Sequence, residues 1–148
     1  HSLPLSELTV RYWYQNESDS AETFFCDWAA VGCNNITGTF GTANEMQYLE
    51  IGFVEGIVFG SADSGQIQLR THHVDWATYD ETNDYSYNAS SNLGAWERVT
   101  AYHNGELIWG MEPSVPTAVG LVGQSADSGT MSSFYLLLFV SLITIFMQ

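Results

Sequence analysis

The sequence contains no lysine and only three arginines, Arg11, Arg70 and Arg98, against seventeen acidic residues. Its formal net charge is −14 at pH 7. Nucleic-acid partners require a basic face that neutralises phosphates, and anionic lipid surfaces attract clusters of Lys and Arg. The composition therefore argues against a nucleic-acid partner and against peripheral docking on anionic lipid.

The sequence also lacks the short motifs that carry catalysis. No HExxH, Gly-rich phosphate loop or nucleophile elbow is present. His72 and His73 are adjacent, so on a strand they would face opposite ways and could not share one metal. Acid pairs such as Asp80 and Glu81 occur, but nothing places two carboxylates across a cleft. We therefore predict that this chain is not an enzyme.

Aromatic residues are abundant, at 14% of the chain, and the other polar residues are mostly neutral or acidic. This composition suits a neutral, hydroxyl-rich partner such as a sugar. No segment shows a long helical period. Short alternating segments instead predict strands, at residues 8–14, 23–26, 36–40, 46–53, 65–70, 99–102 and 107–110. The Asn104-Gly105 pair predicts a hairpin turn. The expected fold class is an all-β, antiparallel jelly-roll sandwich.

The composition changes after Pro113, which predicts a domain over residues 1–113 and a Ser/Gly/Thr linker over 114–133. Residues 134–148 are apolar and uncharged, but they are short for a membrane-spanning helix, which needs about 20 residues. A polar spacer before a terminal apolar run is typical of a glycolipid (GPI) anchor signal, for which Ser125 is the preferred attachment site. A short tail anchor or a free hydrophobic end are the alternatives.

Glycosylation triplets begin at Asn16, Asn35 and Asn88. Together with the tail they favour a secreted protein held at the outer face of the plasma membrane, with glycans expected on Asn35 and Asn88. In such an oxidising compartment Cys26 and Cys33 would form a disulfide. The alternative is a pair of buried thiols in a core strand.

The stretch from Asp75 to Tyr87 is too polar for a core strand and too aromatic for an ordinary loop. Asp80, Asn83 and Asp84 supply oxygen atoms within five residues. Carboxylate, amide and carbonyl oxygens are the ligands of hard cations such as Ca²⁺. An Asx-rich turn, in which these side chains cap their own backbone, is the alternative.

Several stretches occur in the order seen in one known family. They are Leu8–Tyr14, Thr23–Ala30, Tyr48–Phe53, Gln66–Arg70, Asp75–Tyr79, Thr82–Tyr87, Val99–Tyr102 and Leu107–Pro113. Over residues 5–113 the sequence resembles a family 3 carbohydrate-binding module, the cellulose-binding module of cellulosomal scaffolds and cellulases. The first strands of that family would precede His1, so we expect the chain to be a fragment whose sheet either has an exposed edge or needs a partner.

The resemblance implies a nine-stranded jelly roll with a structural calcium ion. By motif, the implied calcium ligands are the backbone carbonyl of Gln15 and the side chains of Glu17, Asp80, Asn83 and Asp84. A glycan on Asn16 would crowd this loop, so we expect Asn16 to be unmodified.

The resemblance also implies a flat cellulose-binding strip, in which aromatic rings stack on glucose rings and polar groups bond to hydroxyls. The matching residues are Asp27, Trp28, Gln68, Arg70 and Trp76, with Arg70 paired to Asp27. Burial in the core is the alternative for the two tryptophans. The loop over residues 29–35 lacks the insertion that carries a further strip tyrosine, so we expect a shorter strip.

The opposite face of this family has a shallow groove, which Arg11, Glu50 and Tyr85 match. Arg11 and Glu50 are equally well explained as an ion pair between strands. The leading hypothesis is a module that binds cellulose or a related β-glucan at a cell surface. The alternatives are a helper module with a glycoside hydrolase domain upstream, and a structural cell-wall or matrix protein.

Overall fold

The computed structural model describes residues 3–54, 58–59, 65–90, 96–114 and 143–148. The elements, in chain order, are β1 (Leu3–Pro4), η1 (Leu5–Glu7), β2 (Leu8–Tyr14), β3 (Glu22–Ala29), η2 (Cys33–Asn35), β4 (Ile36–Ala43), β5 (Met46–Phe53), β6 (Val58–Phe59), β7 (Ile67–His73), η3 (Glu81–Asn83), β8 (Thr100–His103), β9 (Glu106–Trp109) and β10 (Ile143–Met147). Its helical elements are three single 3₁₀ turns, so the described chain is all-β.

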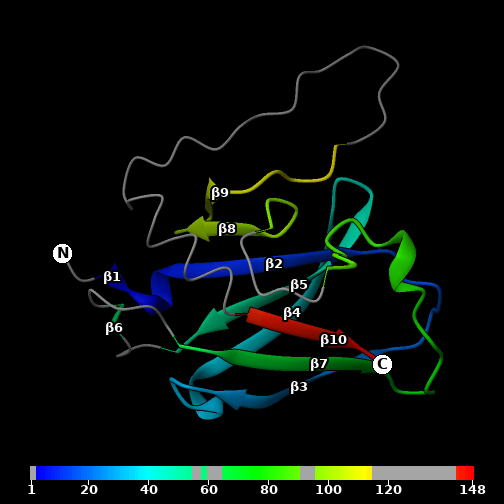
Figure 1. Ribbon diagram of the computed structural model, residues 1–148, viewed down its shortest axis with the longest axis horizontal. Helices are drawn as coiled ribbons and strands as arrows, with labels where there is room; N and C mark the ends of the chain where they lie inside the picture. The colour runs from blue at the N-terminus through cyan, green and yellow to red at the C-terminus, as the bar shows by residue number, and fades with distance from the viewer. Residues whose placement is uncertain (1–2, 55–57, 60–64, 91–95, 115–142) are drawn as a thin grey trace.

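The strands form two main layers (Figure 1). One sheet has five strands in the order β4-β5-β2-β8-β9, and the other has three in the order β10-β7-β3. A small pair, β1 with β6, lies beside them. All pairings are antiparallel except β10 with β7, which is parallel. The all-β sandwich predicted from the sequence is confirmed, with this one parallel pairing added.

The alternation of side chains along the strands builds the core between the layers. In β7 the burial alternates without interruption: Ile67 and Leu69 are fully buried, whereas Gln68 and Arg70 are partly exposed. The five-stranded sheet contributes buried Val10, Leu49 and Ile51. Each such aliphatic side chain contributes roughly 1.5–3 kcal/mol when it leaves water. This burial fixes which face of each strand remains available at the surface.

The predicted strand positions agree closely with the structure, and residues 8–14 and 46–53 coincide with β2 and β5. The hairpin at Asn104-Gly105 is also confirmed. These two residues have φ of 49° and 82°, the left-handed conformations that a tight two-residue hairpin turn requires.

The C-terminal segment gives a less expected result. Ile143–Met147, part of the predicted anchor signal, runs parallel to β7, and Gln148 N–H donates to the carbonyl of Thr71 at 2.9 Å. Strand β10 therefore covers one edge of β7. The linker after Ser114, Ser125 and residues 134–142 lie outside the described residues. No helix within the described ranges is long and apolar enough to cross a membrane.

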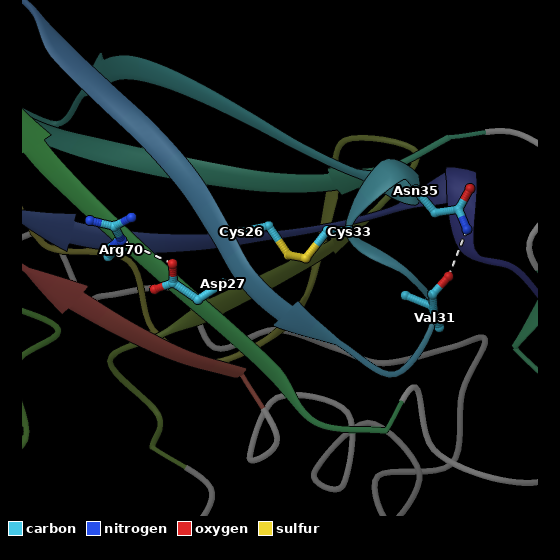
Figure 2. The surroundings of a disulfide bond; sticks show 6 residues. All are labelled: Cys26, Asp27, Val31, Cys33, Asn35 and Arg70. Carbon is cyan, nitrogen blue, oxygen red and sulfur yellow. Dashed lines mark hydrogen bonds and ion pairs between the residues drawn. A yellow bond between two sulfur atoms is a disulfide. The ribbon is translucent and has the colours of Figure 1, made fainter.

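The predicted disulfide is present. Cys26 on β3 is bonded to Cys33 at the start of η2, with the two Cα atoms 5.6 Å apart (Figure 2). The Asn35 Nδ2 atom donates to the carbonyl of Val31 at 2.6 Å and closes the same loop from within. These two links stabilise the short connection between β3 and β4, next to the exposed end of β3.

Replacing both cysteines with serine should lower the melting temperature by roughly 10 °C, since closing an eight-residue loop restricts the unfolded chain by about 2 kcal/mol. Thermal melts followed by circular dichroism would measure the change. A reducing agent should lower the melting temperature of the wild-type protein and leave the double variant unaffected. Equal melting temperatures for the wild type and the variant would show that the bond contributes nothing to stability.

Candidate functional site

The outer face of the β3–β7 pair carries most of the predicted strip. Because Ile67, Leu69, Thr71 and His73 point into the core, the intervening residues of β7 face outward. Gln68, Arg70 and His72 thus form a row along one strand. The register places Phe25 of β3 opposite Arg70 and Trp28 opposite Gln68, so β3 supplies a second, parallel row.

A β-bulge determines which residues of β3 reach this face. The register shifts between Cys26 and Trp28, so that Asp27 is an extra residue in the strand. A bulge breaks the strict alternation of side chains and re-aims the residues at its site. Asp27 and Trp28 are accordingly both exposed, Trp28 at 49%, whereas the next residue, Ala29, is buried. Without this bulge one of the two would point into the core.

Arg70 and Asp27 are paired as the sequence predicted (Figure 2). Arg70 Nε donates to Asp27 Oδ1 at 2.9 Å, and both side chains are more than a third exposed. Exposed ion pairs of this kind contribute little to stability. The same guanidinium lies over the ring of Phe25, with its carbon 4.9 Å from the ring centroid. The contacts with Asp27 and Phe25 therefore matter chiefly for geometry, because together they fix the plane of the Arg70 guanidinium.

Trp76 lies on the turn after β7 and is the most exposed large apolar residue described, at 66%. Its φ of 60° is left-handed, which is costly for a bulky residue. Trp76 N–H donates to the carbonyl of His73, and Ala77 N–H donates to Asp75 Oδ1. The bond from Ala77 lowers the pKa of Asp75, so the carboxylate that holds the turn stays charged. Exposure of Trp76 and Trp28 agrees with the family resemblance and rules out core burial.

The sequence-based prediction missed two members of this face, Phe25 and His72. Phe25 is 39% exposed, and its ring stacks on His72 with centroids 5.3 Å apart. His72 in turn stacks on Trp76 at 4.1 Å. A period of two from Arg70 places His72 on the strip face, so the alternation of β7 could have revealed it.

The predicted calcium ligands gather around Asp84. Gln15 N–H donates to Asp84 Oδ1 at 2.8 Å, and Glu17 Oε1 accepts from Asn83 Nδ2 at 3.0 Å. Asp80 caps the η3 turn by accepting from Thr82 N–H, as the Asx-turn alternative required. The Asx turn and the calcium site are therefore compatible. One oxygen of Asp80 closes the turn, and the turn belongs to the same acidic loop.

Asp84 is the unusual member of this loop. It is only 6% exposed, and its Oδ2 atom is buried without a hydrogen-bond partner among the described residues. Burial raises the pKa of Asp84 to about 7, against the opposing bond from Gln15 N–H, and the nearby Glu17, Glu81 and Asp80 raise it further. A hard cation would bind such a buried carboxylate oxygen together with the neighbouring acidic side chains. The residues present fit calcium, although no three acidic, histidine or cysteine side chains among the described residues already converge as a metal cluster.

Two of the matched groove residues, Arg11 and Glu50, form an ion pair on the five-stranded sheet. Arg11 Nε donates to Glu50 Oε2 at 2.6 Å, and these residues are direct partners in the β2–β5 register. The guanidinium carbon of Arg11 also lies 4.1 Å from the ring centroid of Tyr48 and 4.4 Å from that of Tyr102. Tyr85 instead donates its hydroxyl to the carbonyl of Met111. The contacts support the structural ion pair for Arg11 and Glu50.

The three glycosylation triplets differ in the contacts of their asparagines. Asn16 Nδ2, the atom a glycan would occupy, donates to Glu22 Oε1 at 3.1 Å. Asn35 Nδ2 donates to Val31 (Figure 2). Asn88 is exposed, and its Oδ1 accepts from Ser90 N–H in a local turn. Asn88 is thus the most exposed of the three asparagines.

A two-layer β sandwich with a solvent-exposed row of aromatic, guanidinium and amide groups defines a class of protein, the non-catalytic sugar-binding modules. The family model described as a cellulose binding domain matches residues 1–110. The chain therefore belongs to family 3 of the carbohydrate-binding modules, the cellulose binding domain family.

Similar curated proteins are much longer than this chain. It is 40% identical over 121 residues to Exoglucanase-2 of Thermoclostridium stercorarium, covering 76% of this chain and 13% of that protein. It is 41% identical over 126 residues to Cellulosomal-scaffolding protein A of Acetivibrio thermocellus, covering 76% and 7% respectively. The chain thus corresponds to a small part of each relative.

Solved structures agree with the fold. The module CBM3b from cellobiohydrolase 9A of Clostridium thermocellum matches with a TM-score of 0.67 at 29% identity, covering 74% of this chain and 76% of that one. The family 3a module from the cipA scaffolding of the same organism matches with a TM-score of 0.63 at 38% identity, covering 74% and 80%. The resemblance noted from the sequence is confirmed at the level of family and fold.

The raised pKa of Asp84 predicts a pH dependence that calcium should cancel. A proton on Asp84 stabilises the folded state, and this contribution is complete below pH 3.8 and lost as the pH rises through about 7. In a chelator, the melting temperature should therefore fall between pH 5 and pH 8. Excess calcium should restore roughly 10 °C at pH 8, as expected for a ligand present at about 100 times its Kd.

Asp84→Asn is the matched control, because its amide oxygen can still accept from Gln15 N–H while the charge is gone. The variant should show a weaker fall from pH 5 to pH 8 and no calcium effect at pH 8. Calorimetry in chelator and in calcium would record both. Identical responses of Asp84→Asn and wild type would exclude Asp84 as the group responsible.

Proposed function

We propose that this chain binds cellulose or a related β-glucan through the exposed face of β3 and β7. The observation that carries the proposal is the exposure of two indole rings, Trp28 and Trp76, on either side of the fixed Asp27–Arg70 pair. Indole faces stack on the apolar faces of sugar rings, while the Gln68 amide and the guanidinium bond to hydroxyls. The net charge of −14 does not oppose a neutral glycan.

The short loop after β3 supports one refinement of this proposal. Only seven residues separate Trp28 from Ile36, the first residue of β4, and the disulfide closes part of that connection. Trp28 is therefore the last described residue of the strip at the end next to this loop. With few stacking positions, we propose that single or disordered glucan chains are bound at least as well as crystalline surfaces.

Trp76→Ala and Trp28→Ala should each weaken binding to microcrystalline cellulose about fivefold, since one aromatic stacking contact contributes on the order of 1 kcal/mol. Depletion isotherms with the purified domain would measure the affinity. Met111→Ala is the matched control, because Met111 is also an exposed apolar residue, at 43%, but follows β9 of the other sheet. Unchanged affinity in both tryptophan variants would rule out the strip as the binding surface.

The acidic loop supports a structural role for calcium within this function. Glu17, Asp80, Asn83, Asp84 and the carbonyl of Gln15 would hold the ion. A cation there would neutralise the buried Asp84 carboxylate. Loop residues 15–17 precede β3, and residues 80–84 follow the turn that bears Trp76. Calcium would therefore stabilise segments at one end of the strip and take no direct part in sugar recognition.

We propose two contexts for this module. The polar spacer and apolar tail support a secreted module held at the cell surface by a glycolipid on Ser125, with glycans on Asn88 and Asn35. Attachment at Ser125 would remove β10 and leave that edge of β7 uncovered. The relatives support the other context, since their names describe an exoglucanase and a scaffolding protein, in which the module would serve a catalytic domain elsewhere in the protein.

The anchor proposal predicts that, in a eukaryotic cell, phosphatidylinositol-specific phospholipase C releases the protein from the surface. Deleting residues 134–148 should send the protein into the medium instead. Flow cytometry of an N-terminally tagged chain, before and after the phospholipase, would measure both effects. Release by alkaline carbonate alone, or retention after the phospholipase, would contradict glycolipid attachment.

A further inference from the structure

Four side chains on the strip face form one continuous stack. The rings of Trp76 and His72 lie 4.1 Å apart and are parallel to within 4°, and those of His72 and Phe25 lie 5.3 Å apart at 14°. The guanidinium carbon of Arg70 lies 4.9 Å from the Phe25 centroid. Arg70 and Trp76 belong to the strip that the family resemblance implies. Phe25 and His72, which that resemblance does not include, connect them.

The register explains why the stack runs along β7. Arg70 and His72 are alternate residues of one strand, so their side chains leave the same face about 6.6 Å apart. Phe25 is the direct partner of Arg70 on β3. Side chains at this spacing can both reach one ring on the neighbouring strand. Phe25 contacts both Arg70 and His72 in this way.

The turn after β7 brings Trp76 onto the free side of His72. The left-handed φ of Trp76, 60°, directs its side chain back over the strand, and Asp75 secures the turn through Ala77 N–H. His72 Nδ1 lies 2.8 Å from the carbonyl of His73. A carbonyl only accepts hydrogen bonds, so Nδ1 carries the proton and the bond fixes the plane of the imidazole.

The stack determines which part of Trp76 a glycan can use. His72 covers one face of the indole, and the residue is nevertheless 66% exposed. The opposite face of the indole is therefore the one left for a sugar ring. The orientation of that face depends on His72, because no other described aromatic ring stacks on Trp76.

We propose that His72 and Phe25 are positioning residues of the glycan site, which hold the Trp76 indole and the Arg70 guanidinium in their binding orientation before the glycan arrives. This proposal rests on the proposed function of the strip. A side chain that is already ordered loses less rotamer freedom on binding. His72 and Phe25 therefore raise affinity through Trp76 and Arg70, without being required to touch the sugar themselves.

The test compares His72→Ala with His72→Phe in depletion isotherms on cellulose. Removal of the ring should weaken binding about 3- to 10-fold, the range expected when one side chain must be ordered on binding. The phenylalanine variant keeps a flat ring between Phe25 and Trp76 but loses the bond to the His73 carbonyl, so it should recover most of the affinity that His72→Ala loses. His103→Ala is the matched histidine control, since His103 pairs with Glu7 at the end of β8, in the other sheet. Thermal melts of each variant check that the domain remains folded.

Phe25→Leu provides a second, independent variant, because it keeps an apolar side chain but removes the ring between Arg70 and His72. It too should lose about 3- to 10-fold in affinity. The proposal is overturned if His72→Ala binds as tightly as wild type or more tightly, or if His72→Phe is as weak as His72→Ala. If Trp76→Ala and Trp28→Ala bind like wild type, the strip itself fails. If they weaken and His72→Ala does not, only the positioning role fails.

Discussion

The pairing of β3 with β7 is the constraint on which the surface of this domain depends. Hydrophobic burial of Ile67 and Leu69 fixes one face of β7 in the core, and the opposite face must then carry Gln68, Arg70 and His72. A slip of one residue would exchange these two sets completely. The core and the strip are therefore two consequences of the same register, and the bulge at Asp27 is where the β3–β7 pairing departs from it.

The adjacent histidines show how closely the two faces are connected. His72 lies outside in the ring stack, while His73 is fully buried and lies 2.7 Å from both the Ala77 carbonyl and Asn16 Oδ1. Asn16 also donates to Glu22, which accepts the hydroxyl protons of Tyr14 and Tyr79. These bonds join the acidic loop, the core and the turn that bears Trp76. Burial and these bonds raise the pKa of both tyrosines, which keeps their hydroxyls as donors.

Much of the fold was predictable because it depends on short-range patterns. Alternation located β2 and β5, and the Asn104-Gly105 pair located the hairpin. The ordered motifs identified the family, and through it Trp28 and Trp76 as exposed residues. The strand β10 was not predictable, because a terminal apolar run has the same composition whether it enters a membrane or pairs with a sheet edge.

The sequence by itself determined the all-β class, the acidic surface, the family and most residues of the candidate strip. Those properties follow from composition, period and motif order, which are local along the chain. The tertiary structure alone decided that Phe25 contacts both Arg70 and His72, and that Asp84 keeps a buried oxygen for which the described residues offer no partner. Both depend on which strands and loops meet in space. Contacts between segments tens of residues apart arise from register and burial, which no single segment specifies.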